Sequence, residues 1–386
     1  MAVPVIGIVA GEASGDLLGS QLMRALLEQR PDLRFVGIGG PQMEAAGMQS
    51  WFPLERLAVR GYLEVLRHLP GIVALRRDLI SRMLADPPAL FIGIDAPDFN
   101  FGVERTLRRS GIPAVHYVSP SLWFWRGERI HKIKRSVDKV LALFPFEPPI
   151  YERAGVPVAF VGHPLADMLH AFPKQAEVRE QLRLPGQAPV VAMLPGSRQG
   201  ELEQMADLFV QTAIRVQATL PEARFLVPLV TRETRTIFET AIWRHAPGAP
   251  EFALLFGHAH DALRAADVAL VASGTATLEA ALLGCPMVIN YRVPPAAATA
   301  YKLLRTAYLP YFGLPNILAG EFIVPELIQE HATPENLAQA LLNLYRDDVV
   351  RDRVRERFAA IADSLRQDGA RTAAREVLAM LEQRRA

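Results

Sequence analysis

The chain has 386 residues, 50% of them hydrophobic, and its 42 basic residues nearly balance its 41 acidic ones. This length suggests two domains of ordinary size, and the charge balance gives no bulk field of the kind that attracts nucleic acid. One cysteine, Cys285, permits no disulfide within the chain, and without a basic leader or about 18 successive apolar residues we expect neither a signal peptide nor a spanning helix.

The chain begins with the pattern of a strand, a glycine turn and a helix. Val3–Ala10 is apolar and β-branched, Gly11–Asp16 forms the turn, and leucines at helical spacing follow. This arrangement opens a βαβ unit, in which a ligand meets backbone N–H groups at the helix N-terminus. The turn matches neither the dinucleotide fingerprint nor a P-loop. We place Glu12, Ser14 and Gly15 in a candidate ligand site, with an ordinary capped turn as the alternative.

Further strand-like runs alternate with helical patterns in both halves of the chain. In the first half they are Phe35–Ile38, Leu90–Ile94, Ala114–Val118 and Val140–Leu143. In the second half they are Val190–Leu194, Phe225–Val227, Phe252–Leu255, Val268–Val271 and Met287–Tyr291. This alternation predicts an α/β protein with two doubly wound parallel sheets. We expect a hinge between them at His163–Asp167 and the polar stretch Lys174–Arg183.

A second glycine turn opens the second half. It follows the strand Val190–Leu194 and contains Gly196, Ser197 and Arg198. Backbone N–H groups at a helix start, together with one arginine, make a suitable pocket for a diphosphate. The alternative is an ordinary helix start.

A third turn consists of small residues. Ser273, Gly274, Thr275 and Ala276 follow a buried strand and allow close approach of a ligand to the backbone, and Glu279 lies one helical turn further on. A carboxylate there could accept hydrogen bonds from both hydroxyls of a ribose. Alternatively, Glu279 is a solvated acid that complements the helix dipole. Two such turns in one sheet favour a single nucleotide crevice.

Six motifs, spread in order over nearly the whole chain, together resemble the lipid-A-disaccharide synthase family, which has the GT-B glycosyltransferase architecture. They are Gly11–Asp16, Asp95–Asn100, Ser119–Trp125, Leu194–Arg198, Ser273–Glu279 and Pro315–Gly320. Leu122 and Phe124 depart from the residues we expect in the third motif, which affects the shape of that loop.

The resemblance implies two Rossmann-like domains that face a central cleft. Residues 1–168 would bind the acceptor, residues 169–345 would bind a UDP-sugar, and the helices of 346–386 would pack back on the first domain. The implied reaction joins UDP-2,3-diacylglucosamine to the 6-hydroxyl of 2,3-diacylglucosamine 1-phosphate. The donor bond is α and the product bond is β-1,6, so the configuration inverts and UDP leaves.

Inversion in one displacement needs a base on the acceptor side and charge stabilisation on the leaving group. Asp98, after the strand Leu90–Ile94, is the expected base, although Asp95 or Asp98 could instead cap the next helix. If Asp98 is not the base, Glu12 or Asp95 takes that role. The residues expected to bind the acceptor or line the cleft are Glu12, Ser14 and Gly15, together with Asn316 from the last motif. No Asp-x-Asp triplet or cysteine–histidine cluster occurs, so we expect no metal and no cofactor.

Three stretches combine apolar and basic residues, as a lipid acceptor under phosphate head groups requires. They are Gly61–Leu69 with Arg76 and Arg77; Trp123, Trp125 and Arg126; and Arg129, His131, Lys132, Lys134 and Arg135. In each stretch, the apolar residues could equally be ordinary core and the basic residues a solvated helix face. We expect a cytoplasmic protein at the cytoplasmic face of the inner membrane that contacts its lipid, without a nucleic-acid partner. A homodimer is left open.

Three other functions stay open at this point. Another UDP-sugar enzyme of the same architecture, such as an epimerase or a cell-wall N-acetylglucosaminyltransferase, would share the nucleotide loops but would not need the apolar patches. A non-catalytic UDP-sugar sensor would tolerate loss of Asp98. A nucleic-acid binder would use the basic stretches, but the chain has no recognised motif for that role.

Overall fold

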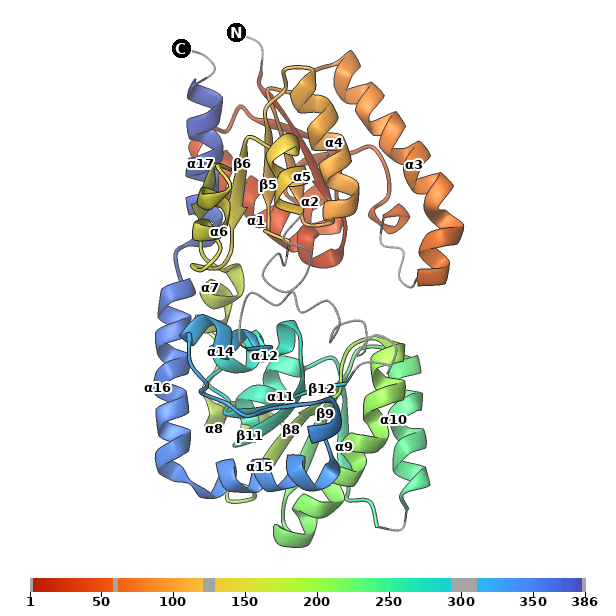
Figure 1. Ribbon diagram of the computed structural model, residues 1–386, viewed down its shortest axis with the longest axis vertical. Helices are drawn as coiled ribbons and strands as arrows, with labels where there is room; N and C mark the ends of the chain where they lie inside the picture. Colours follow the sequence, from red (N-terminus) through yellow and green to blue (C-terminus); the bar gives the residue numbers. More distant parts are fainter. Residues whose placement is uncertain (1–2, 58–61, 121–128, 247, 293–310, 384–386) are drawn as a thin grey trace. The chain divides into compact units, whose positions relative to one another are not determined.

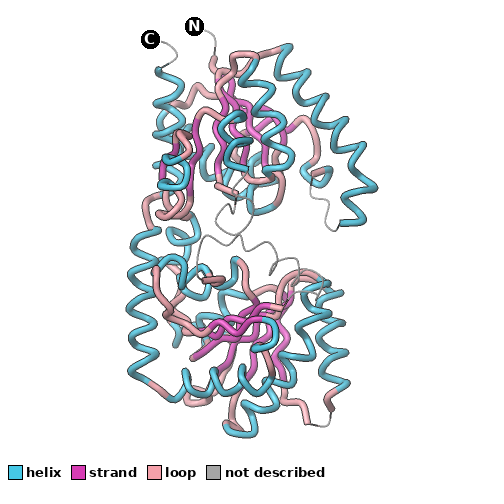
Figure 2. Tube along the Cα trace, viewed as in Figure 1, coloured by secondary structure: helices cyan, strands magenta, loops and turns pink. Residues whose placement is uncertain are grey.

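The computed structural model describes residues 3–57, 62–120, 129–246, 248–292 and 311–383. The chain forms two units, the first built from Met1–Asp167 and Leu365–Ala386 and the second from Met168–Ser364. Each unit is a sheet covered by helices (Figures 1 and 2). The chain passes from the first unit to the second within helix α7 (Pro164–His170), where the sequence predicts a hinge, and returns to the first unit at the end of helix α16 (Asp348–Leu365). Residues 346–364, expected in a separate C-terminal segment, belong to the second unit.

The first unit contains a parallel sheet. Its described strands, in the order β3-β2-β1-β4-β5-β6-β7, place β1 beside β4 at the point where the strand order reverses. The strands are β1 (Val5–Ala10), β2 (Arg34–Ile38), β3 (Met48–Ser50), β4 (Leu90–Ile94), β5 (Ala114–Tyr117), β6 (Lys139–Ala142) and β7 (Val158–Phe160). The central β4 is buried throughout, as a strand covered on both faces must be.

Helices pack on this sheet through apolar side chains. They are α1 (Ala13–Gln29), α2 (Pro41–Ala45), α3 (Tyr62–Ala85), α4 (Pro97–Arg109), α5 (Arg129–Ser136), α6 (Pro148–Arg153) and α17 (Gly369–Gln383). In one cluster, Leu75 and Leu79 of α3 and Val103 of α4 pack with Val9 and Phe91 of the sheet. Each such burial contributes about 1.5–3 kcal/mol, so the sheet holds α4 firmly.

The C-terminal helix α17 belongs to the first unit. Asp167, in α7, accepts hydrogen bonds from the N–H groups of Gly369 (2.8 Å) and Asp368 (3.3 Å) and so caps the start of α17. Lys139 of β6 forms an ion pair with Glu376 of α17. The end of the chain is therefore fixed to the first sheet.

The second unit repeats the same plan. Its described strands are parallel in the order β10-β9-β8-β11-β12-β13, which again reverses, here between β8 and β11. The strands are β8 (Val190–Leu194), β9 (Arg224–Leu229), β10 (Phe252–Phe256), β11 (Val268–Ala272), β12 (Met287–Tyr291) and β13 (Glu326–Ile328). The helices are α8 (Gln175–Gln181), α9 (Gln199–Thr219), α10 (Arg232–Arg244), α11 (Ala259–Ala265), α12 (Thr275–Leu282), α14 (Leu314–Ala319), α15 (Pro334–Arg346) and α16 (Asp348–Leu365).

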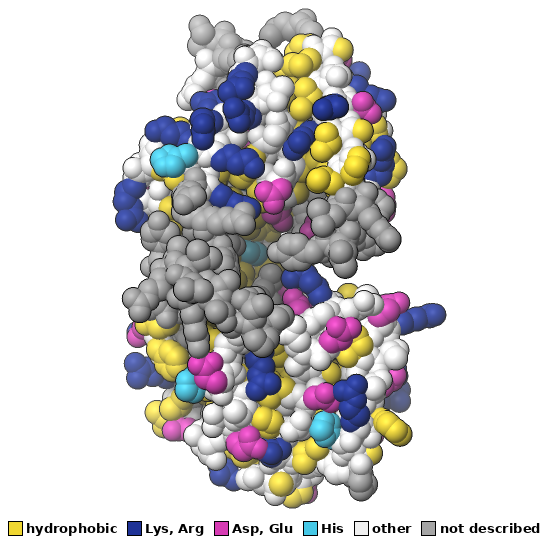
Figure 3. All heavy atoms as spheres, turned by 45° about the vertical axis from the view of Figure 1, so that its right-hand side comes forward, with side chains coloured by type: hydrophobic (Ala, Val, Ile, Leu, Met, Phe, Trp, Pro, Cys, Tyr) yellow, Lys and Arg dark blue, Asp and Glu magenta, His cyan; other side chains and the backbone are white. Residues whose placement is uncertain are grey.

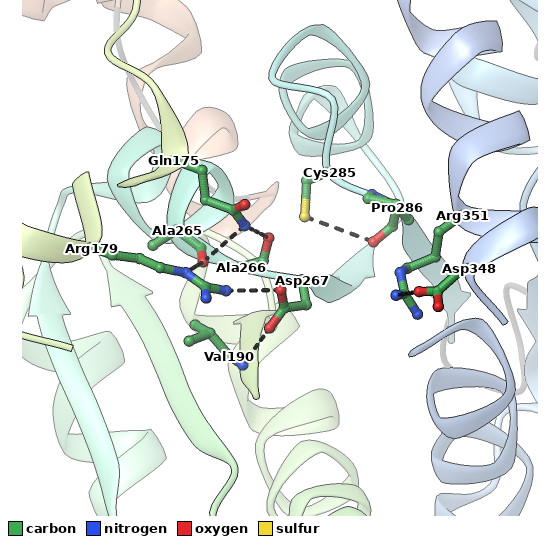
Figure 4. A network of polar contacts seen from close by, with 10 residues as sticks. All are labelled: Gln175, Arg179, Val190, Ala265, Ala266, Asp267, Cys285, Pro286, Asp348 and Arg351. Carbon is green, nitrogen blue, oxygen red and sulfur yellow. Dashed lines mark hydrogen bonds and ion pairs between the residues drawn. The ribbon is translucent and has the colours of Figure 1, made fainter. Parts of the chain in front are cut away.

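A polar network ties α8 to the amino ends of β8 and β11 (Figure 4). Asp267 accepts a hydrogen bond from the N–H of Val190 (2.9 Å) and pairs with Arg179 (2.8 Å). Gln175 and Arg179 also donate to the carbonyl oxygen of Ala265. This network lies at the sheet edge opposite the loops described below, so we regard it as structural. Within the described residues, no helix is long and apolar enough to cross a bilayer.

Candidate functional site

The two nucleotide loops expected from the sequence follow adjacent strands of the second unit. Leu194, at the end of β8, lies opposite Val271 of β11. The turn of Gly196, Ser197 and Arg198 and the turn that begins at Ser273 therefore emerge side by side at the carboxyl edge. This is the point where the strand order reverses, and ligands of open α/β sheets bind at such points.

Glu201 holds the first of these turns. Its carboxylate accepts hydrogen bonds from the N–H groups of Ser197 (3.0 Å) and Arg198 (3.2 Å) and pairs with the Arg198 guanidinium (3.0 Å). Gly196 has φ +123°, a conformation that side chains rarely adopt. The N–H groups of Ser197 and Arg198 thus donate to a carboxylate in the first turn of α9 (Gln199–Thr219), and the diphosphate site expected at this turn stays a prediction. The Arg198 side chain, 79% exposed, is the group that this loop offers to an anion.

The second turn leads into α12, which begins at Thr275. Gly274, with φ +153°, precedes the helix, and within the described residues no side chain caps its start. Ser273 and Ala276 are half-buried, whereas Gly274 and Thr275 are exposed. The small residues leave this helix start open to a ligand, as the sequence predicts.

Glu279, in the second turn of α12, is paired with a histidine that the sequence did not reveal. Nε2 of His260, on α11, lies 3.3 Å from Oε2 of Glu279. A hydrogen bond to Glu279 raises the pKa of His260 above its ordinary value, against the opposing effect of partial burial. The ring of Phe172 packs edge-on against His260 at 5.9 Å. Glu279 is therefore a fixed carboxylate beside the nucleotide loops rather than a freely solvated acid.

Asn316 lies on α14, which packs against α12, and is wholly buried. Its Nδ2 donates to the carbonyl of Val324 (2.9 Å) and to Glu326 (2.8 Å), and its Oδ1 accepts from the N–H groups of Ile323 (2.9 Å) and Val324 (3.0 Å). These four bonds use the full capacity of the amide. The side chain thus holds the loop after α14, whereas the sequence led us to expect a contact with substrate.

In the first unit, the loops after β1 and β4 touch. A Cβ on Gly11 would lie 2.4 Å from Cβ of Ala96, so only glycine allows this approach. Glu12 and Ser14 are exposed beside it, and Gly15 is buried against the ends of both strands. These candidate residues therefore lie at the point where the order of the first sheet reverses.

The last residue of the first motif is structural. Asp16 is 3% exposed, and its carboxylate accepts hydrogen bonds from the N–H groups of Gly40 (2.9 Å), Gln42 (3.0 Å) and Met43 (3.0 Å). It therefore caps α2 rather than its own helix, and it fastens the loop after β2 to α1.

Asp98 is presented by a strained turn. Asp95 (φ +49°) and Ala96 (φ +42°) are both left-handed, which costs about 1–2 kcal/mol for a residue with a side chain. The buried Asn100 compensates by donating to the carbonyl of Asp95 (2.8 Å). Within the described residues, no side chain caps the start of α4. The Asp98 side chain is 80% exposed, and Arg129 Nη2 lies 3.6 Å from its Oδ1.

A buried ionisable pair lies under this turn. Nδ1 of His116, on β5, is 2.7 Å from Oε1 of Glu104, on α4, and both side chains are fully buried. Gly93 of β4 makes room for them, because a Cβ there would lie 2.1 Å from Glu104 Oε1. Burial raises the pKa of Glu104, although His116 opposes this. The pair anchors the helix that carries Asp98 to the centre of the sheet.

A second buried polar group lies after β5 and β6. Ser119 and Tyr151 share a hydrogen bond of 2.7 Å between their hydroxyls, and Glu147 accepts from the N–H of Phe144 (2.9 Å). Burial raises the pKa of Glu147 to about 8 and lowers that of the nearby His163 to about 4. Both groups are therefore neutral at pH 7, which lowers the energetic cost of burying them.

Basic side chains lie on α5 beside Asp98. His131, Lys132, Lys134 and Arg135 are exposed on this helix, as is Arg77 on α3. Figure 3 shows basic and apolar side chains intermingled on a face of the first unit. The expected contributions of Trp123, Trp125 and Arg126, and of the side chains of residues 61–68, lie outside the described residues.

Solved structures share this architecture. The calicheamicin glycosyltransferase superposes with a TM-score of 0.61 at 19% identity, over 99% of both chains. A UDP-GlcNAc 2-epimerase from Neisseria meningitidis, solved with UDP-GlcNAc, has a TM-score of 0.63 at 12% identity, over 97% of this chain and 98% of its own. At these identities the similarity shows the fold alone, the GT-B type predicted from the sequence.

Sequence comparison is more specific. Residues 6–378 match the family described as lipid-A-disaccharide synthetase. The lipid-A-disaccharide synthase of Methylobacillus flagellatus is 55% identical over 380 residues, which cover 98% of this chain and 100% of the relative. A match over nearly the whole chain and relatives of this identity show that this chain belongs to the lipid-A-disaccharide synthetase family of glycosyltransferases.

Proposed function

We propose that this chain transfers 2,3-diacylglucosamine from its UDP derivative to the 6-hydroxyl of 2,3-diacylglucosamine 1-phosphate. The products are the β-1,6-linked tetraacyl disaccharide 1-phosphate and UDP. The family membership supports the reaction class, and the observation that carries the mechanism is the exposed carboxylate of Asp98 at the reversal point of the first sheet.

The second unit supplies the donor site in this proposal. The exposed Arg198 pairs with the diphosphate. The small residues Ser273–Ala276 let the diphosphate approach the N–H groups at the start of α12. Glu279, held by His260, accepts the ribose hydroxyls. Together these groups stabilise the charge that develops on the leaving UDP.

The first unit supplies the base. The acceptor O6 forms a bond to the anomeric carbon while the bond from that carbon to the diphosphate oxygen breaks, and UDP leaves with the electron pair. The Asp98 carboxylate takes the O6 proton. A single displacement turns the α donor bond into a β product bond. Glu12 and Ser14 line the same edge of the sheet and are assigned to the acceptor.

The basic face of α5 suits an anionic membrane surface, where the acylated substrates are dissolved. We infer peripheral attachment at the cytoplasmic face of the inner membrane. The protein should float with anionic vesicles at low salt and be released as salt rises, because exposed charges are screened within about 10 Å at 0.1 M. Failure to bind anionic vesicles at low salt, or equal binding to RNA, would contradict this attachment.

The catalytic proposal is tested by Asp98→Asn, which keeps the shape of the side chain and removes its ability to take a proton. We expect disaccharide formation to fall by about 10²–10⁴-fold, the usual contribution of a general base, with unchanged UDP affinity and circular dichroism. Asp78→Asn, an exposed change on α3, is the control. Near-normal turnover would transfer the role to Glu12 or Asp95, whereas unfolding would make Asp98 structural.

A further inference from the structure

Two arginines from different helices each approach Asp98, in the first turn of α4. Arg129 of α5 places Nη2 3.6 Å from Asp98 Oδ1, and Arg76 of α3 places Nη1 3.5 Å from the backbone carbonyl oxygen of the same residue. The proposed base therefore has one guanidinium group near its carboxylate and a second near its backbone carbonyl, at the edge of the sheet where the acceptor is expected.

The path of Arg76 across α4 depends on a glycine. A Cβ on Gly102 would lie 2.8 Å from Arg76 Nη1 and 3.2 Å from its Cζ, so the absent side chain makes room for the guanidinium. Glycine is among the least favourable residues inside a helix. The passage of Arg76 gives a physical reason for glycine at this position.

The contacts that hold these arginines are weak. Asp98 is 80% exposed, and ion pairs between exposed groups contribute little because water screens them. A phosphate monoester carries nearly two negative charges and three acceptor oxygens, and it binds arginine through paired, charge-assisted hydrogen bonds. Such a ligand would compete successfully with these contacts.

We propose that Arg76 and Arg129 bind the 1-phosphate of the acceptor and thereby orient its 6-hydroxyl toward Asp98. In a hexose, C1 and the carbon that bears C6 both adjoin the ring oxygen, so phosphate and hydroxyl project from the same edge of the sugar. A phosphate held by arginines beside Asp98 therefore brings the hydroxyl to the base. This assignment rests on the proposed function and makes the two arginines determinants of acceptor specificity.

The test compares 2,3-diacylglucosamine with and without its 1-phosphate, in mixed micelles, as acceptor and as ligand. Arg76→Gln and Arg129→Gln should each lower kcat/KM for the phosphorylated acceptor by about tenfold or more, as expected for loss of a hydrogen bond to a charged group. For the acceptor without phosphate, kcat/KM should stay unchanged. The preference for phosphate therefore falls, and direct binding measurements should show the same loss.

Two further variants separate position from charge. Gly102→Ala keeps the charge of Arg76 but displaces it, so it should reproduce the effect of Arg76→Gln with an intact fold. Arg109→Gln, an exposed change in the last turn of α4, should leave the preference unchanged.

Two results would overturn the assignment: equal losses for both acceptors, which would mean that the arginines act on the base or the fold, or no loss for either. If the wild-type protein makes no disaccharide from either acceptor, the proposed function fails. In that case the binding measurements still decide whether these arginines recognise phosphate.

Discussion

Nε2 of His260 lies 3.3 Å from Oε2 of Glu279, so the carboxylate assigned to the ribose is oriented by a histidine from the neighbouring helix. Because the pKa of His260 is raised, mainly by this hydrogen bond, the histidine keeps its proton to a higher pH than usual. The interaction is fully present below the ordinary pKa of 6.5 and is lost as the pH rises through the raised value.

We therefore expect the affinity for a UDP-sugar to fall as the pH rises above about 6.5. His260→Gln should weaken binding about 3–10-fold at pH 6.5, the loss of about one ordinary hydrogen bond, and should flatten the pH dependence. Calorimetry with a UDP-sugar is suitable because its diphosphate diester does not titrate in this range. His258→Gln, whose histidine pairs with Asp261 instead, is the control. Unchanged pH dependence in His260→Gln would remove this pair from the donor site.

Arg198→Ala should weaken UDP binding by about 1.5–3 kcal/mol, the range for a hydrogen bond to a charged group. The side chain is exposed, and its visible partner in the fold is Glu201, so the change should leave thermal stability nearly unaltered. Arg235→Ala, another exposed arginine with a nearby glutamate partner, is the matched control. Equal UDP affinities for both variants and the wild type would exclude Arg198 from the site.

The sequence predicted the central strands of both sheets but not three edge strands. Each predicted run corresponds to an observed strand, because buried parallel strands leave a strong apolar signal. The short strands β3, β7 and β13 have only three residues each and lie at sheet edges. A run of three residues is too short to show a periodic pattern, and these strands are mostly only partly buried, so they lack the apolar signal of the central strands.

Within the candidate site, the sequence located the loops but not the contacts inside them. Strand–turn–helix patterns placed Gly196 and Ser273 at one sheet edge, as the adjacent strands β8 and β11 show. The bonds from the N–H groups of Ser197 and Arg198 to Glu201 are local, and a glutamate at the third position of a helix commonly binds back to the backbone before the helix, so this contact had a signal in the sequence. The contact of His260 with Glu279 is tertiary: it depends on how α11 packs against α12, and local spacing does not reveal it.

Glu147→Gln should change how stability depends on pH. The folded-state pKa of about 8 lies above the ordinary 4.5, so at pH 7 the folded protein holds a proton that the unfolded chain has released. The stability due to this group is full below about pH 4.5 and is lost as the pH rises through about 8. Each pKa unit corresponds to about 1.4 kcal/mol.

The glutamine cannot ionise, so urea unfolding of Glu147→Gln should show a gain of at least about 1 kcal/mol at pH 8 relative to the wild type, and little difference at pH 5. Glu152→Gln, an exposed change on α6, should show neither effect. A variant that is equally destabilised at both pH values would mean that the carboxyl group has a specific packing role instead.

The central claim is that this chain joins two acylated glucosamines with inversion. Purified protein should be mixed with UDP-2,3-diacylglucosamine and 2,3-diacylglucosamine 1-phosphate, and the lipid product should be identified by mass spectrometry and by the coupling constant of its new anomeric proton. We predict one tetraacyl disaccharide 1-phosphate with a β-1,6 linkage, formed in equal amount with UDP. An epimerised UDP-sugar, an α-linked disaccharide or UDP release without a disaccharide would contradict the account.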